Sequence, residues 1–94
     1  MTDARFPRPV RLHFKATADR LVASAWEAIE CMRQQWPGHA DRGSYRSAYR
    51  ACRDALDGWR TSVDAYRAFL KAAESAGLLV EKPRREPIET ARAA

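Results

Sequence analysis

The chain has 94 residues, and 17 Lys and Arg against 12 Asp and Glu give it a formal net charge of +5. This length corresponds to one small domain and excludes enzymes built from separate cofactor and substrate domains, while the basic balance favours polyanionic partners. Much of the apolar composition is Ala, with 18 residues, so the core must be thin and economical.

Residues 1–9 carry two prolines and little to bury, so we predict an extended lead-in there. Order is expected to begin at Val10, where Leu12 and Phe14 continue an alternation of apolar and polar side chains. This alternation is typical of a strand with one buried face. A second short apolar run can return antiparallel, which predicts a β-hairpin over residues 10–23.

Ser24 and Glu27 form a capping box at the start of the first helix. The Ser24 oxygen can accept the amide of Glu27, while the Glu27 carboxylate reaches back to the Ser24 amide. Pro37 and Gly38 end this helix. Its inward positions are spaced i, i+4, i+7 and i+11 and are Ala25, Ile29, Met32 and Trp36.

A second helix is predicted from Gly43 or Ser44 to Asp57, and Gly58 supplies the left-handed residue after its end. Because its apolar side chains recur every three or four residues, they form one packing stripe. The stripe consists of Tyr45, Tyr49, Cys52 and Leu56.

The third predicted helix opens with a second capping box, Thr61 with Asp64, and closes at Gly77. Leu78 can then fold back onto Ala73, which is the contact that accompanies a Schellman ending. The side chains expected to point inward are Val63, Tyr66, Phe69, Leu70 and Ala73.

The predicted fold class is therefore α+β: an N-terminal β-hairpin followed by three helices in a single domain at residues 10–80. Residues 78–80 can add a short third strand or simply seal the core. Residues 81–94 contain prolines and mixed charges without apolar periodicity, which predicts a mobile C-terminal tail.

Several residues of the predicted helices form one ordered pattern. They are Trp36-Pro37, Arg42-Gly43, Tyr45, Ala48, Cys52, Ala55-Leu56, Gly58, Arg67-Ala68-Phe69, Ala72-Ala73 and Ala76-Gly77. In this pattern the chain resembles, over roughly residues 10–80, a small rhizobial, alphaproteobacterial family catalogued as domain of unknown function 982. The resemblance implies a small cytoplasmic protein and brings no reaction, cofactor or catalytic residue with it. Ser44 departs from the Pro expected after the glycine, and Trp59 is unusual.

Four arginines of the second helix fall within an arc of roughly 80°, at about 100° per residue. They are Arg42, Arg46, Arg50 and Arg53. Tyr45 and Tyr49 border this stripe, so basic and aromatic groups together could contact an anion or a nucleic-acid backbone. A solvated face and a protein contact are the alternatives, and the tyrosine spacing is also that of a core stripe.

Trp26 lies beside the apolar stripe of the first helix, and Trp59 follows the second helix. A chain poor in large apolar residues that leaves a Trp at the edge of a stripe has a candidate anchor for a partner. Packing within the molecule is the alternative for both.

No nucleophile–base pair, phosphate-binding glycine loop or metal-ligand spacing is present, so we predict no enzyme activity, catalytic residue, metal or cofactor. His39 and Asp41 are interpreted as polar loop residues. Cys31 and Cys52 are predicted to be buried, reduced thiols. The N-terminus lacks the apolar run of a secretory signal, which favours a cytoplasmic protein without a membrane segment.

We expect a non-enzymatic interaction module with an unidentified protein partner, self-associating as a homodimer. The expected interface is the unpaired hairpin edge, and the Trp26 side of the first helix is the alternative. A small basic regulator that binds nucleic acid is the second hypothesis. A basic face shared by the second helix and the hairpin would favour nucleic acid, whereas interruption by acids would favour protein contact. The hairpin residues concerned are Arg11, Lys15 and Arg20.

Overall fold

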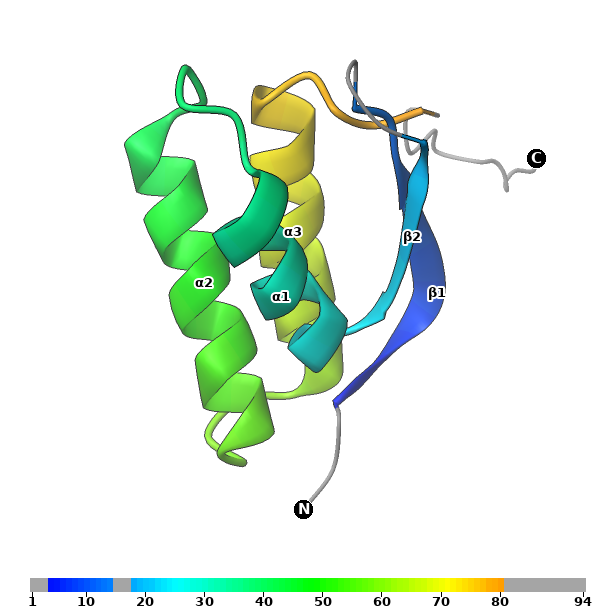
Figure 1. Ribbon diagram of the computed structural model, residues 1–94. Coiled ribbons are helices and arrows are strands. Elements are labelled where there is room, and N and C mark those ends of the chain that lie inside the picture. The colour runs from blue at the N-terminus through cyan, green and yellow to red at the C-terminus, as the bar shows by residue number, and fades with distance from the viewer. Residues whose placement is uncertain (1–3, 15–17, 81–94) are drawn as a thin grey trace, which may run out of the picture.

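The computed structural model of the chain describes residues 4–14 and 18–80. Two strands and three helices follow one another in the predicted order, so the α+β class is confirmed (Figure 1). The elements are β1 (Arg5–Leu12), β2 (Arg20–Ser24), α1 (Ala25–Gln35), α2 (Arg42–Leu56) and α3 (Ser62–Ser75). The predicted mobile tail at 81–94 lies outside the described residues, as do the start of the lead-in and part of the hairpin turn.

The elements are arranged in three layers (Figure 1). β1 and β2 form an antiparallel sheet, in which β1 contacts α3 and β2 contacts α1. α2 packs against α1 and α3 on the side away from the sheet. One side of α2 and one face of the sheet are therefore left as opposite outer surfaces of the molecule.

β1 begins at Arg5 rather than at Val10, so the extended lead-in was predicted too long. The side chain of Phe6 is buried, and its ring contacts Tyr66 in an edge-to-face geometry with centroids 5.5 Å apart. A second contact joins Phe6 to Phe69 at 5.9 Å. The prolines that suggested a lead-in are compatible with this strand because its pairing is irregular where they occur.

That irregularity is a bulge in which residues 6–9 of β1 lie opposite Ala23 of β2. Two of the bulged residues are prolines, which have no N–H to donate to a strand partner. The amide of Ala23 donates instead to Oε1 of Glu27 at 2.7 Å. The predicted capping box is corrected accordingly: Ser24 Oγ accepts the Glu27 amide at 3.2 Å, but Glu27 reaches back to Ala23 rather than to Ser24.

α2 and α3 both end at a glycine in the left-handed region, with φ of 87° at Gly58 and 74° at Gly77. After Gly77, the amide of Leu78 donates to the carbonyl of Ala73 at 2.9 Å, which confirms the predicted Schellman ending. The amide of Trp59 folds back on the last turn of α2 in the same way. Each glycine therefore turns the chain and satisfies carbonyls at a helix end.

The possible third strand at 78–80 is reduced to a single bridge between Leu79 and Leu12. The amide of His13 adds a hydrogen bond to the carbonyl of Leu78 at 2.8 Å. This segment covers the outer edge of β1 at the end of the strand beyond the bulge.

The core between the sheet and the helices is built around Phe69, which is fully buried on α3. Val63 was predicted to point inward, but its side chain is 40% exposed. Six residues at about 100° each place it roughly 120° around the helix from Phe69, outside the buried face. Ala65 and Ala72 occupy that face and let α3 approach both neighbouring layers.

Cys31 and Cys52 are buried free thiols, as predicted. Burial raises the pKa of Cys52 from 9.0 to about 12. Burial also raises the pKa of Cys31, and the charge of Arg20 partly opposes this. Because the thiolate is the reactive form, both thiols are held in the unreactive state at neutral pH.

Raising the pH is expected to weaken the fold through Cys52. Its stabilising effect is complete below the unfolded pKa of 9.0 and is lost as the pH rises towards the folded pKa of about 12. Between about pH 8 and pH 10 this group lowers the free energy of unfolding by about 1.4 kcal/mol. Urea denaturation of the wild type and of Cys52→Ala at both pH values measures the effect. The same pH dependence in the two proteins would contradict this assignment.

Candidate anion-binding groove

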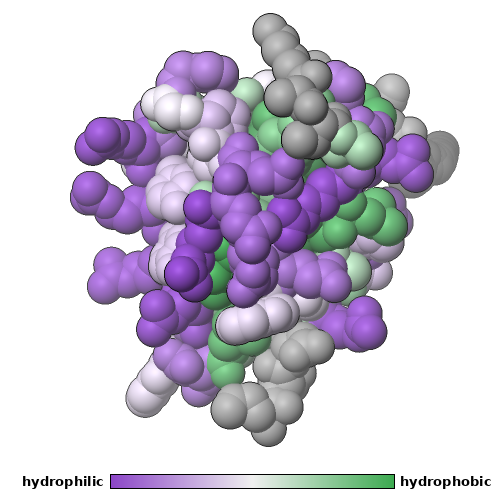
Figure 2. Space-filling view, viewed as in Figure 1, coloured by the Kyte–Doolittle hydropathy of each residue, from purple (hydrophilic) through white to green (hydrophobic). Residues whose placement is uncertain are grey.

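α2 places all four predicted arginines on its solvent-exposed side. The helix starts at Arg42, earlier than predicted, because Asp41 is its N-cap and accepts the amide of Ser44 at 2.8 Å. Its opposite face is buried by small residues, namely Ala48, Ala51, Cys52 and Ala55. Figure 2 shows hydrophilic side chains projecting from the α2 side of the molecule.

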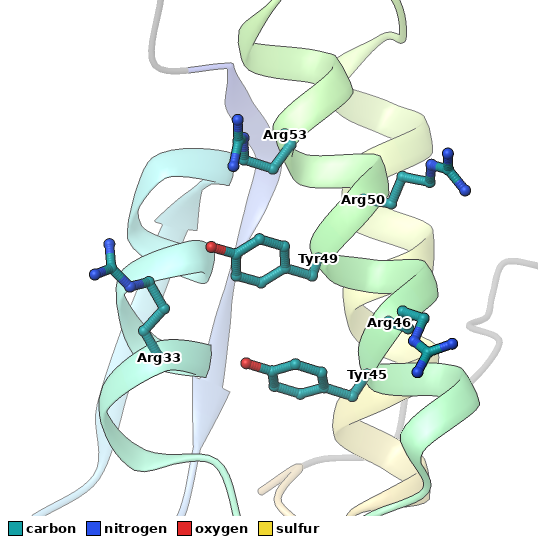
Figure 3. A pocket seen from close by; sticks show the side chains of 6 residues that line it. All are labelled: Arg33, Tyr45, Arg46, Tyr49, Arg50 and Arg53. Carbon is teal, nitrogen blue, oxygen red and sulfur yellow. The ribbon is translucent and has the colours of Figure 1, made fainter.

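A groove of about 540 Å³ lies between α1 and α2 (Figure 3). Three arginines of the predicted stripe line the groove, namely Arg46, Arg50 and Arg53. The fourth, Arg42, lies outside its lining. The full lining is Arg33, Tyr45, Arg46, Tyr49, Arg50 and Arg53. Arg33 was not predicted, because it belongs to α1 and no spacing in the sequence relates it to the residues of α2.

The two tyrosines are half-buried and form the wall of the groove. Their rings stack on each other with centroids 6.0 Å apart and an interplanar angle of 25°. The hydroxyl of Tyr45 donates to the carbonyl of Met32 at 3.2 Å, which ties α2 to one of the last carbonyls of α1. The Tyr45 ring also contacts Trp36 of the core cluster. The core role predicted for the tyrosines is therefore confirmed in part, since each ring is also half-exposed.

The hydroxyl of Tyr49 points from α2 towards α1 and has no hydrogen-bond partner among the described residues (Figure 3). Arg33 and Arg53 lie on the same side of α2 as this hydroxyl, whereas Arg46 and Arg50 extend on the other side. Within residues 4–14 and 18–80, no hydrogen bond or ion pair engages these four guanidinium groups. The groove thus contains several hydrogen-bond donors that have no acceptor among the described residues.

Two arginines of the described chain outside the groove are engaged. Arg20 donates to Oε1 of Gln35 at 2.8 Å, and Arg60 lies 3.5 Å from a carboxylate oxygen of Asp54. The side chains of five arginines outside the groove lining also have no hydrogen bond or ion pair among the described residues, namely Arg5, Arg8, Arg11, Arg42 and Arg67. What distinguishes the groove is that four such side chains line one cavity.

The groove does not continue into a basic face on the hairpin, because α1 and α3 lie between α2 and the sheet (Figure 1). Arg11 is exposed on the sheet, Arg20 is bonded to α1, and Lys15 lies outside the described residues. No carboxylate is among the residues that line the groove in the described chain. The result is a compact basic groove, neither a continuous basic face nor a stripe interrupted by acids.

Trp26 and Trp59 are exposed, with 51% and 81% of their surface accessible. They lie where α1 begins and where α2 has ended, at the same end of the molecule (Figure 1). Seven residues separate Trp26 from Arg33, about two helical turns, so both lie on the same face of α1. Trp26 is nevertheless not among the residues that line the groove. Trp59 does not line the groove.

The other polar residues considered from the sequence have structural surroundings. The hydrogen bond from the Ser44 amide lowers the pKa of Asp41, consistent with its role as the N-cap of α2. His39 is exposed in the loop before it. In the part of the chain that the structure describes, no group of His, Cys, Asp and Glu side chains is arranged to hold a metal ion, and no helix has the length and apolar character to cross a membrane.

A family model described as Protein of unknown function (DUF982) matches residues 8–80. The chain belongs to the DUF982 family. This confirms the resemblance seen in the ordered pattern of helix residues. No curated protein matches this DUF982 protein.

The NMR structure of the Agrobacterium tumefaciens protein Atu1219 is similar to this DUF982 protein, with a TM-score of 0.70 and 28% sequence identity. The similarity covers 99% of this chain and 92% of the Agrobacterium chain. The fold and its alphaproteobacterial relationship are thus shown, while the ligand of the groove has to be argued from the groove itself.

The contrast between the two tyrosine hydroxyls is testable by stability. Tyr45→Phe removes the hydrogen bond to the Met32 carbonyl and is expected to lower the free energy of unfolding by about 1 kcal/mol. Tyr49→Phe removes a hydroxyl without a partner in the described fold and is expected to leave stability nearly unchanged. Urea denaturation followed by circular dichroism compares the two variants, and equal losses would contradict the different roles assigned to them.

Proposed function

We propose that this DUF982 protein is a non-enzymatic, cytoplasmic interaction module that binds an acidic segment of a partner protein in the groove between α1 and α2. The observation that carries the proposal is that one groove is lined by four arginines and one tyrosine hydroxyl that have no hydrogen bond or ion pair among the described residues. The cytoplasmic location is supported by the two free thiols, which are typical of a reducing compartment.

The chemistry of the lining suits a carboxylate-rich or phosphorylated ligand. Guanidinium groups offer planar, paired donors that match such oxygen acceptors, and the tyrosine rings provide apolar contact beside them. A volume of about 540 Å³ is within the range of ligand-binding clefts. The positive potential of the groove also favours the approach of an acidic partner.

The size of the groove supports a short segment more than an extended nucleic acid. From Arg46 to Arg53 the helix rises only about 10 Å, at about 1.5 Å per residue. The faces of Tyr45 and Tyr49 are turned to each other, whereas proteins that bind single strands present aromatic faces to the bases. The hairpin arginines, which would lengthen the basic surface, lie on another side of the molecule.

The proposal predicts binding of a short, labelled polyglutamate peptide that weakens with salt. Arg46→Glu combined with Arg53→Glu is expected to reduce the affinity by about tenfold or more. The matched control, Arg8→Glu with Arg67→Glu, makes the same charge change on exposed residues outside the groove lining and is expected to change the affinity much less. Fluorescence anisotropy measures all three proteins.

Two outcomes would overturn this function. Equal loss in the groove variant and in its control would mean that only net charge matters. Binding of a duplex oligonucleotide but not of the peptide, with a log–log salt slope of roughly −3 to −4, would instead favour nucleic-acid recognition through about four phosphate contacts.

We also propose that the protein self-associates through the outer face of the sheet and the edge of β2. The supporting observation is that Leu21, 55% exposed, pairs with Arg11 on the side of the sheet away from the core, and Val80 is exposed beside Arg11. The edge of β1 is less suitable, because its bulge contains two prolines and segment 78–80 covers its far end. This moves the expected interface from either hairpin edge to the β2 edge alone.

Leu21→Glu is expected to convert a homodimer to a monomer, because it buries a charge in the proposed interface. Val63→Glu places the same charge on another exposed apolar position, on α3, and is expected to leave the dimer intact. Sedimentation equilibrium at micromolar concentration measures the mass, and a wild-type species of 10.7 kDa would contradict self-association.

A further inference from the structure

We propose that Arg33, Arg53 and the hydroxyl of Tyr49 form a subsite for a phosphate monoester within the groove. This inference rests on the proposed function and deepens it, since it names the chemical group that the groove prefers. It starts from the Tyr49 hydroxyl, which, unlike that of Tyr45, has no hydrogen-bond partner among the described residues.

The position of that hydroxyl is set by its surroundings. The Tyr49 ring is half-buried and stacked on Tyr45, whose own hydroxyl is held by the Met32 carbonyl. The Tyr49 hydroxyl is therefore a donor on an ordered support, available to a ligand without breaking a contact among the described residues. Such preorganised donors lose less conformational freedom on binding than freely rotating side chains do.

The two guanidinium groups approach this hydroxyl from different helices. Figure 3 shows Arg33 reaching from α1 and Arg53 from α2, both on the side to which the tyrosine hydroxyls point. Arg46 and Arg50 line the same groove but project on the other side of α2. The four arginines thus divide into a pair beside Tyr49 and a pair facing away from it.

Three donor groups from three directions match a phosphate monoester better than they match other anions. A monoester carries a charge of about −1.5 to −2 and three terminal oxygens. A carboxylate has one charge and two oxygens, and a phosphodiester in a nucleic-acid backbone likewise has one charge and two free oxygens. Two cations and a hydroxyl donor therefore leave no terminal oxygen of the monoester without a partner.

The arrangement also carries an electrostatic cost without a ligand. Two like charges face one groove, and none of its lining residues in the described chain is acidic. A dianion between them removes this repulsion, whereas a single carboxylate removes only part of it. The monoester is either part of a modified side chain of the partner protein or part of a free small molecule, since both present the same terminal group.

The test compares probes at constant ionic strength by NMR titration of the full chain. Phenyl phosphate is expected to bind at least about tenfold more tightly than benzoate or dimethyl phosphate, because hydrogen bonds to charged groups are strong. A phosphoserine peptide that binds much more tightly than phenyl phosphate would identify a modified protein as the source. Similar affinities would identify a free phosphorylated compound.

Matched variants locate the subsite. Arg33→Gln with Arg53→Gln is expected to weaken phenyl phosphate binding by about tenfold or more, and Tyr49→Phe by about fivefold. Arg8→Gln with Arg67→Gln removes the same charge from exposed residues outside the groove lining and is expected to change the affinity by about twofold or less. Because Tyr49→Phe is expected to keep the wild-type stability, its loss of binding would not reflect unfolding.

Four results would overturn the subsite. Equal weakening by the two arginine pairs, or equal affinity for phenyl phosphate and benzoate, would leave an unselective basic groove and would not affect the proposed function. Polyglutamate binding without phenyl phosphate binding would likewise overturn the subsite and leave the proposed function standing. Absence of binding to every anionic probe would overturn the subsite and the proposed function together.

Discussion

The close packing of α2 on α1 and α3 is the constraint on which both the core and the groove depend. The buried face of α2 consists of alanines and one cysteine, which allow close contact between helices in a chain with few large apolar side chains. Larger side chains cannot enter such a contact and lie at its borders. The two tyrosines are at the border with α1, where their rings seal the core on one side and form the groove wall on the other.

The distribution of charge over the surface follows from the same packing. Once one side of α2 is buried, its arginines are confined to the remaining surface, and Arg33 of α1 comes to lie opposite them. Elsewhere, Arg20 contacts Gln35 and Arg60 contacts Asp54, while the other arginines of the described chain that do not line this groove are exposed. Like charges that line one groove repel each other, and natural proteins retain such costs mainly where binding relieves them. Four arginines from two helices line one groove that has no acidic lining residue in the described chain, and this distinguishes the groove from an ordinary solvated face.

The sheet supports α1 and α3 from the other side and controls how its own edges can pair. The bulge at residues 6–9 lets β1 contain two prolines and still bury Phe6. Because of the bulge, the amide of Ala23 is available to donate a hydrogen bond to the carboxylate of Glu27. The Glu27 side chain therefore links the sheet to the start of α1. The result is a small sheet whose β1 edge is poorly suited to pairing and whose outer face remains apolar at Leu21.

The sequence by itself determined the helix ends and the arginine stripe. Caps such as Thr61 and glycines such as Gly77 act on residues only a few positions away, and helical spacing alone decides which side chains share a face. The early start of β1 was missed because local propensity opposes it, while the interactions that stabilise it are tertiary: the contacts of Phe6 with α3 and the pairing of Arg5 with Ser24. Only the tertiary structure could bring Arg33 to the Tyr49 hydroxyl, because spacing within one helix contains no information about how a second helix packs against it.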